Sequence, residues 1–348
     1  MAKKKAMLVG GFGMIGRHII QALEKEGDWE IVGLARRPPS FKTRAKAISV
    51  DLLNRDDAEA KLGGLSDVTH IFFAGLSGGV AAENTEDNLA LVANSIGVVA
   101  PIAKNLKRVV LTQGGKYYGV HLGPHKTPSK ETDPRHLPPN FYYDQQDFIA
   151  KLQKGKSWDY ACVRPEAVIG YATGIPLNCA SLIAHYAIVC REMGVPFHFP
   201  GTQASFNAYN RFTDARILGR FQAFVATNPR CGGQAFNITN DSGFRWSTVW
   251  PFFADYFKVP VGMVMPFDLN VMMKEAESLW PKIIKKHALK QDQFGACDWG
   301  FANWFFNRWW DTILEDVKRI QYGFYEVIDT EQSFKDAFDT MRKEKVIP

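Results

Sequence analysis

The chain has 348 residues, of which 46% are hydrophobic and 22% charged, and its formal net charge is +6. This composition is ordinary for a globular protein. No apolar run approaches the roughly 18 residues that cross a bilayer, so we expect neither a membrane protein nor a membrane partner. The basic residues are scattered rather than gathered in a stripe, which argues against nucleic-acid binding. A mild positive bias suits an anionic cofactor.

The cysteines and histidines show no pattern typical of a metal site or of paired disulfides. The five cysteines are widely spaced without any C-x-x-C, and the eight histidines form no H-E-x-x-H or similar pattern. We therefore expect reduced thiols, a cytoplasmic location and no bound metal. The cysteines are Cys162, Cys179, Cys190, Cys231 and Cys297.

The first 160 residues alternate short apolar runs with longer amphipathic ones, which is the rhythm of βαβ units. The apolar runs are rich in β-branched or aromatic residues and contain few charges, as strands buried on both faces of a parallel sheet do. The predicted strands are Ala6–Gly11, Glu30–Ala35, Ala45–Leu52, His70–Gly75, Arg108–Gly114 and Tyr160–Pro165. The predicted helices between them are Met14–Lys25, Asp56–Leu62, Thr85–Ala103 and Asn140–Lys154.

The second half of the chain is less regular and more aromatic. Helices are predicted over Ser181–Gly194 and Phe212–Thr227, and Asp298–Asp311 is the most aromatic segment. We interpret that segment as a core or lid helix that packs on the sheet domain, with a substrate-facing apolar wall as the alternative. The predicted fold is α/β, with a Rossmann doubly wound parallel sheet over residues 1–170. A smaller, mostly helical substrate lobe over residues 171–348 is interleaved with it in one structural unit.

A glycine pattern follows the first predicted strand. The segment "LVGGFGMIGRHII" places Gly10, Gly13 and Gly16 between a strand and a helix. The first glycine permits a tight turn, the second lets backbone N–H groups approach a diphosphate, and the third lets the helix pack closely on the strand. The helix N-terminus then attracts the phosphates. The pattern predicts dinucleotide binding at this turn, Ile15 included, and a tight turn without a ligand is the alternative.

The end of the second strand predicts which dinucleotide binds. In "GLARRPP", Ala35 stands where an acid would bind the ribose 2′-hydroxyl of NAD, and Arg36 and Arg37 follow. Because a forked guanidinium pairs well with phosphate oxygens, we expect NADP or NADPH; two solvated loop arginines are the alternative. Asp51, after the third strand, is placed to meet the adenine, and capping of the next helix is the alternative.

Two adjacent tyrosines open the helix predicted from Asn140. A phenol titrates near pH 10, so it needs a nearby cation to act as an acid or base at neutral pH. In ordinary short-chain dehydrogenases that cation is a lysine four residues along, but here Gln146 follows Tyr142 at that spacing. Lys116 lies directly beyond the fifth strand, at the edge where strand ends of a doubly wound sheet converge. We therefore expect Lys116 and Tyr142 to meet, although surface lysines are common.

At these residues the sequence resembles the progesterone 5β-reductase/iridoid synthase family, an atypical branch of the extended short-chain dehydrogenases. The likeness is carried by "LTQGGKYYG" and "LPPNFYYDQQD", and "VRPEAVIGY", "GGQAFNITNDSGFRW" and the closing "EKVIP" also have similar counterparts. The resemblance implies that Lys116 is the family lysine and Tyr142 the family tyrosine. Gln146 stands where the family has glutamate and Glu166 where plant members have glycine, which argues against carrying over steroid or iridoid substrates.

The resemblance also implies a set of cofactor contacts. It places a first group at the diphosphate, the two arginines at the 2′-phosphate, and further groups at the adenine, along the crevice and near the nicotinamide. The residues at the diphosphate are Phe12, Gly13 and Met14, those at the 2′-phosphate are Arg36 and Arg37, and those at the adenine are Asp51 and Leu52. Gly75, Leu76 and Thr112 lie along the crevice, and Val168, Ile175, Pro176 and Leu177 lie near the nicotinamide. Tyr142 itself belongs to both the catalytic and the cofactor set.

From these features we expect an NADPH-dependent reductase of activated C=C bonds, which adds hydride to an enone or enal. Tyr142 would stabilise the enolate and Lys116 would assist it. The same residues serve direct reduction of a ketone or aldehyde, and a non-catalytic NADP(H)-sensing protein is a third hypothesis. The expected substrate is a small apolar compound with a carbonyl group, and the chain is expected to act alone or as a homodimer.

Overall fold

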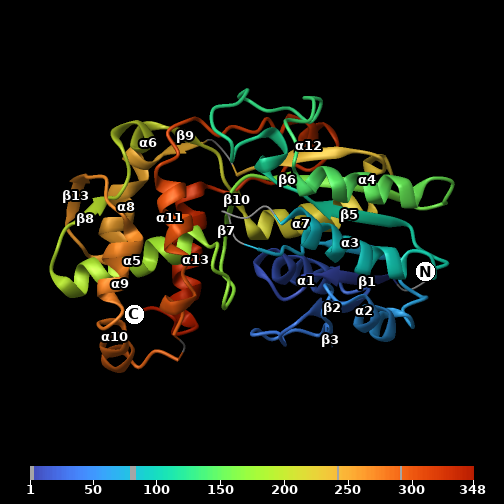
Figure 1. The fold of residues 1–348 in the computed structure, drawn as a ribbon, viewed down its shortest axis with the longest axis horizontal. Helices are drawn as coiled ribbons and strands as arrows, with labels where there is room; N and C mark the ends of the chain where they lie inside the picture. The colour runs from blue at the N-terminus through green and yellow to red at the C-terminus, as the bar shows by residue number, and fades with distance from the viewer. Residues whose placement is uncertain (1–3, 79–83, 241–242, 291) are drawn as a thin grey trace.

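Strands buried on both faces form the centre of the molecule. The computed structural model describes residues 4–78, 84–240, 243–290 and 292–348. In these residues seven strands form one parallel sheet in the order β11-β6-β5-β4-β1-β2-β3 (Figure 1), which confirms the predicted Rossmann fold. The strands are β1 Lys4–Val9, β2 Trp29–Ala35, β3 Lys46–Ser49, β4 His70–Phe73, β5 Arg108–Thr112, β6 Asp159–Pro165, β7 Val168–Ile169, β8 Phe197–Phe199, β9 Tyr209–Asn210, β10 Thr213–Asp214, β11 Ala235–Ile238, β12 Phe244–Arg245 and β13 Val261–Val264.

Helices cover both faces of this sheet because its strands alternate two apolar faces. Ala6 and Leu8 of β1 pack with α1 and α7, whereas Met7 and Val9 pack with α2, α3 and α4. We call this three-layered unit the sheet half.

The helices of the described chain are α1 Met14–Glu26, α2 Arg55–Leu62, α3 Thr85–Val99, α4 Phe141–Gln153, α5 Cys179–Met193, α6 Gln203–Asn207, α7 Ala215–Thr227, α8 Trp246–Phe257, α9 Leu269–Ala276, α10 Trp280–His287, α11 Trp299–Phe306, α12 Val317–Gln321 and α13 Thr330–Lys343, with 3₁₀ turns η1 Gly115–Tyr118, η2 Pro229–Cys231 and η3 Phe294–Ala296.

Most of the remaining helices form a second unit, the lobe, beside the sheet half, on which α12 lies (Figure 1). It consists of α5, α6, α8–α11 and α13 with β8 and β13, and its core is aromatic. Trp250 is 1% exposed and stacks on Phe197 with ring centroids 4.2 Å apart. Phe305 and Phe306 of α11 are buried in this same core. The predicted packing of the aromatic segment on the sheet domain is therefore wrong, because its large rings pack within the lobe.

Several predicted boundaries shift for local reasons. The helix expected from Phe212 begins at Ala215, because the carboxylate of Asp214 caps it by accepting from the Arg216 backbone N–H at 2.6 Å. Asn178 likewise caps α5, which starts at Cys179 instead of Ser181. The seventh strand, β11, was not predicted. It pairs with β6 and comes from the second half of the chain, as does α7, so the two halves of the sequence interleave.

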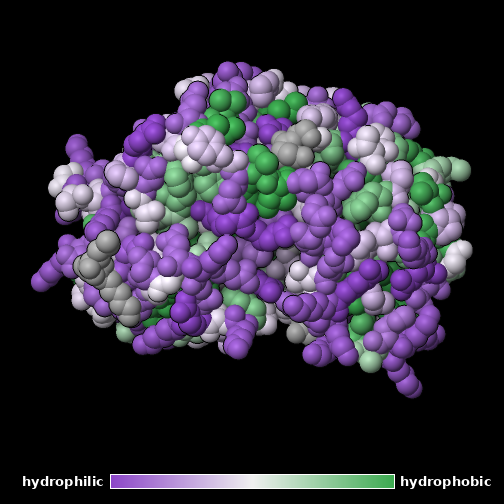
Figure 2. Space-filling view, turned by 180° about the vertical axis from the view of Figure 1, so that it is seen from behind, coloured by the Kyte–Doolittle hydropathy of each residue, from purple (hydrophilic) through white to green (hydrophobic). Residues whose placement is uncertain are grey.

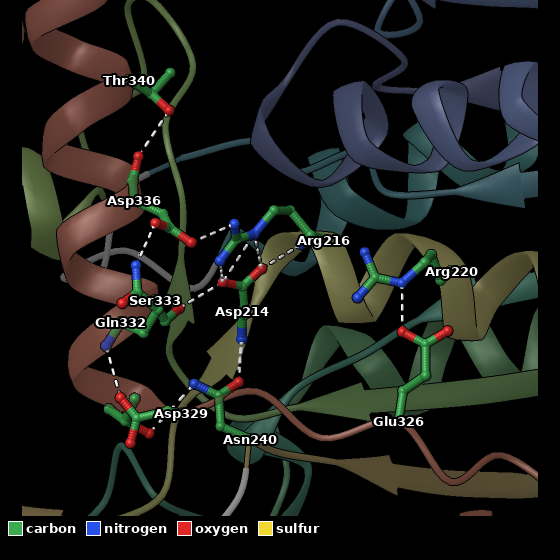
Figure 3. A network of polar contacts seen from close by, with 11 residues as sticks. Asp214, Arg216, Arg220, Asn240, Glu326, Asp329, Gln332, Ser333, Asp336 and Thr340 are labelled. Carbon is green, nitrogen blue, oxygen red and sulfur yellow. Dashed lines mark hydrogen bonds and ion pairs between the residues drawn. The ribbon is translucent and has the colours of Figure 1, made fainter.

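A polar network ties α13 of the lobe to α7 of the sheet half (Figure 3). Arg216 pairs with Asp214 at 2.6 Å and with Asp336 of α13 at 2.5 Å, and the Ser333 hydroxyl donates to Asp214 at 2.6 Å. Burial alone would raise the pKa of Asp214, but the bonds from Arg216 and Ser333 outweigh it and lower that pKa. The carboxylate therefore stays charged and holds the two units together.

One face of the molecule carries few large apolar patches (Figure 2). The face in Figure 2 is mostly hydrophilic, and its hydrophobic residues form small separate groups. In the lobe, a pocket of about 240 Å³ lies beside β8 and β13, away from the sheet edge that bears the predicted site; it is lined by Tyr186, Val195, Pro196, His198, Met265, Phe267 and Met272. Among the described residues, no helix is both long enough and apolar enough to cross a bilayer.

Candidate active site

The turn after β1 presents glycine backbone at the carboxyl edge of the sheet. Gly10 has a φ of 72°, and a Cβ there would lie 2.7 Å from the Ala74 carbonyl oxygen, so only glycine fits. Gly13 caps α1, and a Cβ on Gly16 would lie 2.2 Å from the Gly10 carbonyl oxygen. The first turn of α1 has no acidic side chain, so its open backbone N–H groups suit an anion. The cradle fits the diphosphate of a dinucleotide.

The side chains of this turn pack inward and leave its backbone accessible to a ligand. Phe12 and Met14 are each 9% exposed. The Phe12 ring lies against Gly33, where a Cβ would come within 2.6 Å of it. Ile15 packs against the same apolar layer as α7. Phe12, Met14 and Ile15 are thus held by packing, and contacts from them to a phosphate would come from their main chain.

Both arginines after β2 have exposed side chains. The Arg37 guanidinium donates to the Gly174 carbonyl at 3.4 Å, so it reaches across to the segment that connects β7 with α5. Arg36 contributes its carbonyl oxygen to a bond from Ser49 at 3.3 Å, which leaves its guanidinium in solvent. Two exposed cations therefore stand at the end of β2, where the sequence predicts the contact with a 2′-phosphate.

The predicted contacts along the rest of the edge lie after β3, β4 and β5. Asp51 is exposed, and its carboxylate accepts from the Leu53 N–H at 3.0 Å; the residue that caps α2 is Asn54, so the capping alternative for Asp51 is wrong. Leu52 is buried, Gly75 follows β4 against Val9, and Leu76 is 53% exposed. The Thr112 hydroxyl donates to Gln222 of α7 at 3.3 Å, so this side chain points toward that helix.

The segment expected near the nicotinamide lies against the glycine turn. Met14 packs with Val168 and Ile175 in a small apolar cluster. Pro176 is exposed, and its carbonyl accepts from the Asp298 N–H at 3.4 Å, while Leu177 is half-buried. The structure thus brings the strand-β7 region and the diphosphate turn together across the sheet edge.

Lys116 and Tyr142 lie on two segments that meet at this edge. Asn140, the cap of α4, donates to the Lys116 carbonyl at 2.8 Å. The Lys116 ammonium is 5.8 Å from the centroid of the Phe141 ring, and the Phe141 and Tyr142 rings are 4.3 Å apart. A Cβ on Gly114 would lie 3.0 Å from the Tyr142 hydroxyl. The ammonium and the phenol therefore flank one aromatic ring at the end of β5.

A buried polar chain behind Tyr142 was not predicted. The Gln113 amide donates to the Tyr142 carbonyl at 3.2 Å and to Gln146 at 3.0 Å, and it accepts from Arg164 at 2.8 Å. Arg164 is 2% exposed and lies 3.4 Å from the centroid of the Tyr117 ring. A charged residue inside the apolar strand "YACVRP" was the available signal, because a buried charge needs partners.

A buried ion pair borders the same edge and joins it to the lobe. Glu166 follows β6, and its carboxylate lies 3.1 Å from Arg308, which follows α11. Its other oxygen lies 3.2 Å from where a Cβ on Gly115 would stand, directly beside Lys116. Burial raises the pKa of Glu166, against the opposing pull of Arg308. Position 166 therefore carries a charge-paired side chain next to the candidate catalytic residues.

Two tyrosines near the site have structural roles. Tyr143 donates to the Tyr117 carbonyl at 2.6 Å and accepts from the His136 N–H at 2.6 Å. Tyr118 donates to Asn237 of β11 at 2.7 Å, and burial raises its pKa to about 12. Because the hydroxyls of Tyr143 and Tyr118 are engaged inside the protein, neither serves as a proton donor to a ligand.

Comparison with known proteins gives the class to which this fold and site belong. The model of the PRISE-like Rossmann-fold domain matches residues 46–348. A short-chain dehydrogenase of Penicillium aethiopicum is 30% identical, covering 99% of each chain. An (S)-8-oxocitronellyl enol synthase of Antirrhinum majus is 31% identical, covering 99% of this chain and 92% of the relative.

Solved structures share the fold at low identity. A UDP-glucose 4-epimerase matches with a TM-score of 0.72 and 11% identity over 99% of both chains. A short-chain dehydrogenase/reductase superfamily protein from Agrobacterium tumefaciens, solved with bound NAD, matches with a TM-score of 0.67 and 13% identity over 98% of both chains.

Fold and relatives define an oxidoreductase of the short-chain dehydrogenase/reductase type, and they support an NAD(P)-dependent reductase. Within that class the chain belongs to the PRISE-like Rossmann-fold family, the group of the progesterone 5β-reductase-like enzymes. The resemblance read from the sequence is therefore confirmed.

Proposed function

We propose that the chain is an NADPH-dependent reductase of activated C=C bonds that acts on a small apolar carbonyl compound. The observation that carries this proposal is the meeting of η1 with the start of α4, where Lys116 and Tyr142 flank the Phe141 ring. The relatives named for an enol product support it, because hydride addition to an enal leaves an enolate.

In the proposed reaction, bound NADPH supplies the hydride that goes to the β-carbon of the enone. The π electrons of the C=C bond form a double bond between the α-carbon and the carbonyl carbon, and the C=O π pair moves onto the carbonyl oxygen, to which Tyr142 donates a hydrogen bond. A proton from solvent then adds to the α-carbon and gives the saturated carbonyl compound. The Lys116 ammonium favours this phenol as a donor by its positive charge. A preorganised donor at a developing oxyanion lowers the activation barrier by roughly 3 to 4 kcal/mol. The Gln113 bond to the Tyr142 carbonyl keeps that donor in place.

The preference for NADPH over NADH is assigned to Arg36 and Arg37. Both guanidiniums are solvent-exposed at the end of β2, where a charge-assisted bond to a 2′-phosphate is available. Replacing both by alanine is expected to weaken NADPH binding at least about tenfold and NADH binding far less. Arg230→Ala, at an exposed arginine beside Gln321, serves as the control and should change neither affinity.

The catalytic proposal is tested by Tyr142→Phe with a small cyclic enone and NADPH. The expected result is a fall in kcat of about 100- to 1000-fold with an unchanged dissociation constant for NADPH. Tyr325→Phe, which alters a tyrosine that is 73% exposed, is the matched control and should keep wild-type turnover. Near-wild-type turnover by Tyr142→Phe would remove Tyr142 from the mechanism.

The reaction type is tested by identifying the product. A saturated ketone supports C=C reduction, whereas an unsaturated alcohol would replace it by carbonyl reduction with Tyr142 as proton donor. Tight NADPH binding without any NADPH oxidation across enones, enals and ketones would replace both by a sensing role.

The five cysteines are free thiols, which supports a reducing compartment such as the cytoplasm as the place of action.

A further inference from the structure

The two candidate catalytic side chains do not share a helix, so helical spacing does not fix their separation. On one helix, residues four apart are held as neighbours by the backbone itself. Lys116 lies in η1 and Tyr142 in α4, with a long connecting segment between them. The distance between ammonium and phenol therefore depends on bonds that join η1 to α4.

Three side chains make such bonds, and we call them the clamp: Gln113, Asn140 and Tyr143. Asn140 donates to the Lys116 carbonyl at 2.8 Å, and Tyr143 donates to the next carbonyl, that of Tyr117, at 2.6 Å. Gln113, just before η1, donates in the opposite direction to the Tyr142 carbonyl at 3.2 Å. All three clamp residues are buried. Bonds running both ways across the contact fix η1 against the first turn of α4.

Asn140 has a special place in the clamp because it contacts the backbone of both catalytic residues. Its Oδ1 accepts from the Tyr142 N–H at 3.1 Å, while its Nδ2 donates to the Lys116 carbonyl. The side chain is 2% exposed. The first bond is an ordinary helix cap, which serine or aspartate can also make. The second bond requires an amide donor in that place and does nothing for the stability of α4.

We propose that Asn140 is a positioning residue that sets the separation between the Lys116 ammonium and the Tyr142 phenol. Gln113, held by Arg164, and Tyr143 complete the clamp. This inference rests on the proposed function of Lys116 and Tyr142, and it assigns to Asn140 a role in geometry rather than in contact with substrate. A displacement of about 1 Å in such a pair can reduce the rate by up to about 100-fold.

The test separates the role of Asn140 as the cap of α4 from its bond to the Lys116 carbonyl. Asn140→Ser keeps a cap acceptor for α4 but loses the long amide that reaches Lys116. The matched control is Asn228→Ser. Asn228 caps η2 by accepting from the Arg230 N–H at 3.0 Å and donates to the Tyr322 carbonyl at 3.4 Å. It lies at the opposite edge of the sheet, where its carbonyl accepts from Arg108, the first residue of β5.

Asn140→Ser is expected to lower kcat for enone reduction by about 10- to 100-fold, with KM for NADPH and Tm close to wild type. Asn228→Ser should leave kcat unchanged. In a Lys116→Ala background, Asn140→Ser should have almost no further effect, because residues that act through one another are not additive. If Asn140→Ser does not fold, Asn140→Asp keeps the cap and places an oxygen against the Lys116 carbonyl, with the same expected loss.

A second measurement needs no substrate. The ionisation of Tyr142 is followed by ultraviolet absorbance as the difference between a protein and its Tyr142→Phe counterpart. It should occur at higher pH in Asn140→Ser than in wild type, and Asn228→Ser should not move it. Lys116 and the Glu166–Arg308 pair remain in all of these proteins, so the shift reports the clamp.

Three results would overturn the inference: kcat of Asn140→Ser within twofold of wild type, full additivity with Lys116→Ala, or an unmoved Tyr142 titration in a protein that reduces enones. Failure of the proposed function is seen separately. In that case wild-type protein reduces no enone or Tyr142→Phe retains turnover, whatever the ultraviolet titration of Asn140→Ser shows. An unmoved titration together with active enone reduction would reject only the role of Asn140.

Discussion

The carboxyl edge of the sheet and the lobe are each stabilised internally by a different kind of interaction. At the edge, the buried side chains of Gln113, Asn140 and Arg164 each make directional hydrogen bonds to named atoms. In the lobe, Trp250 and its neighbours contact one another through ring faces and edges, with one indole bond to the Phe197 carbonyl at 3.0 Å. The two regions meet at the Glu166–Arg308 pair and at the network around Asp214.

This difference corresponds to what each region has to do. Directional bonds in a low-dielectric interior fix the position of a few atoms, which an acid–base pair requires. Aromatic packing contributes more free energy per residue but tolerates changes of shape at constant volume. We therefore expect substitutions in the lobe to act on stability and substitutions at the edge to act on turnover.

The largest expected effect is the loss of stability in Trp250→Ala. Removing this buried indole leaves a cavity beside Phe197 and Phe253 and should lower the free energy of unfolding by about 4 kcal/mol. Trp309→Ala, at a tryptophan that is 55% exposed, should change it by less than about 0.5 kcal/mol. Guanidinium unfolding measures both. Equal losses in the two variants would contradict the aromatic-core account of the lobe.

The junction between the regions should be nearly as sensitive. Glu166→Gln leaves the buried Arg308 charge without its counter-charge and should cost about 3 kcal/mol in urea unfolding. A double variant, Glu166→Leu with Arg308→Met, should recover most of that loss because no charge then remains buried. Asp255→Asn, which breaks the exposed pair with Lys258, should have no measurable effect and is the control. A double variant as unstable as the single one would disprove the charge argument.

The sequence predicted the sheet half much better than the lobe, and the reason is physical. Strands such as His70–Phe73 are buried on both faces, so each one is a mostly apolar run that can be recognised locally. Strand β11 contains the polar Asn237 and spans only Ala235–Ile238, so its apolar run is too short to be recognised from the local sequence. The lobe core brings together rings from Phe197 to Phe338, and contacts so distant in sequence leave no periodic pattern.

The candidate site shows the same limit at smaller scale. The glycine turn and the two arginines follow from strand-end rules, so their positions at the edge were predictable. The meeting of Lys116 with the Asn140 helix also followed from those rules, whereas the clamp did not. Gln113 looked like an ordinary polar residue after a strand. Its partners Arg164 and Tyr142 lie far along the chain, and only folded coordinates bring them together.

A pH titration should reveal what one buried histidine of the lobe core contributes to stability. His185 of α5 is fully buried against Trp280, and burial lowers its pKa to about 4. The unfolded chain takes up a proton near pH 6.5, so stability is complete above that pH and falls as pH drops toward 4. By pH 5 the loss from this group is about 2 kcal/mol. His185→Gln should make the fall of unfolding free energy between pH 6.5 and 5 less steep than in wild type, while His18 and His70 of the sheet half, whose pKa burial also lowers to about 4, keep their share of it. An unchanged slope would show that His185 is protonated in the folded state.

The smallest expected effect lies at the sheet edge, where a substitution should lower turnover without lowering stability. Gly114 has an extended φ of −175°, which alanine adopts without strain, but the added Cβ would stand 3.0 Å from the Tyr142 hydroxyl. The phenol must move by a few tenths of an ångström, so Gly114→Ala should lower kcat about tenfold, which equals about 1.4 kcal/mol. Gly64→Ala is the matched control, because nothing lies within 4 Å of its added Cβ.

Both Gly114→Ala and Gly64→Ala restrict the unfolded chain in the same way, so their unfolding free energies should differ little from each other. Steady-state kinetics with NADPH and a small enone then isolates the contact with Tyr142. If Gly114→Ala turns over at the rate of Gly64→Ala, the phenol does not occupy the place beside Gly114 during the reaction. The directional bonds of the edge would then be as tolerant as the aromatic packing of the lobe, and the contrast between the two regions would fail where it matters for chemistry.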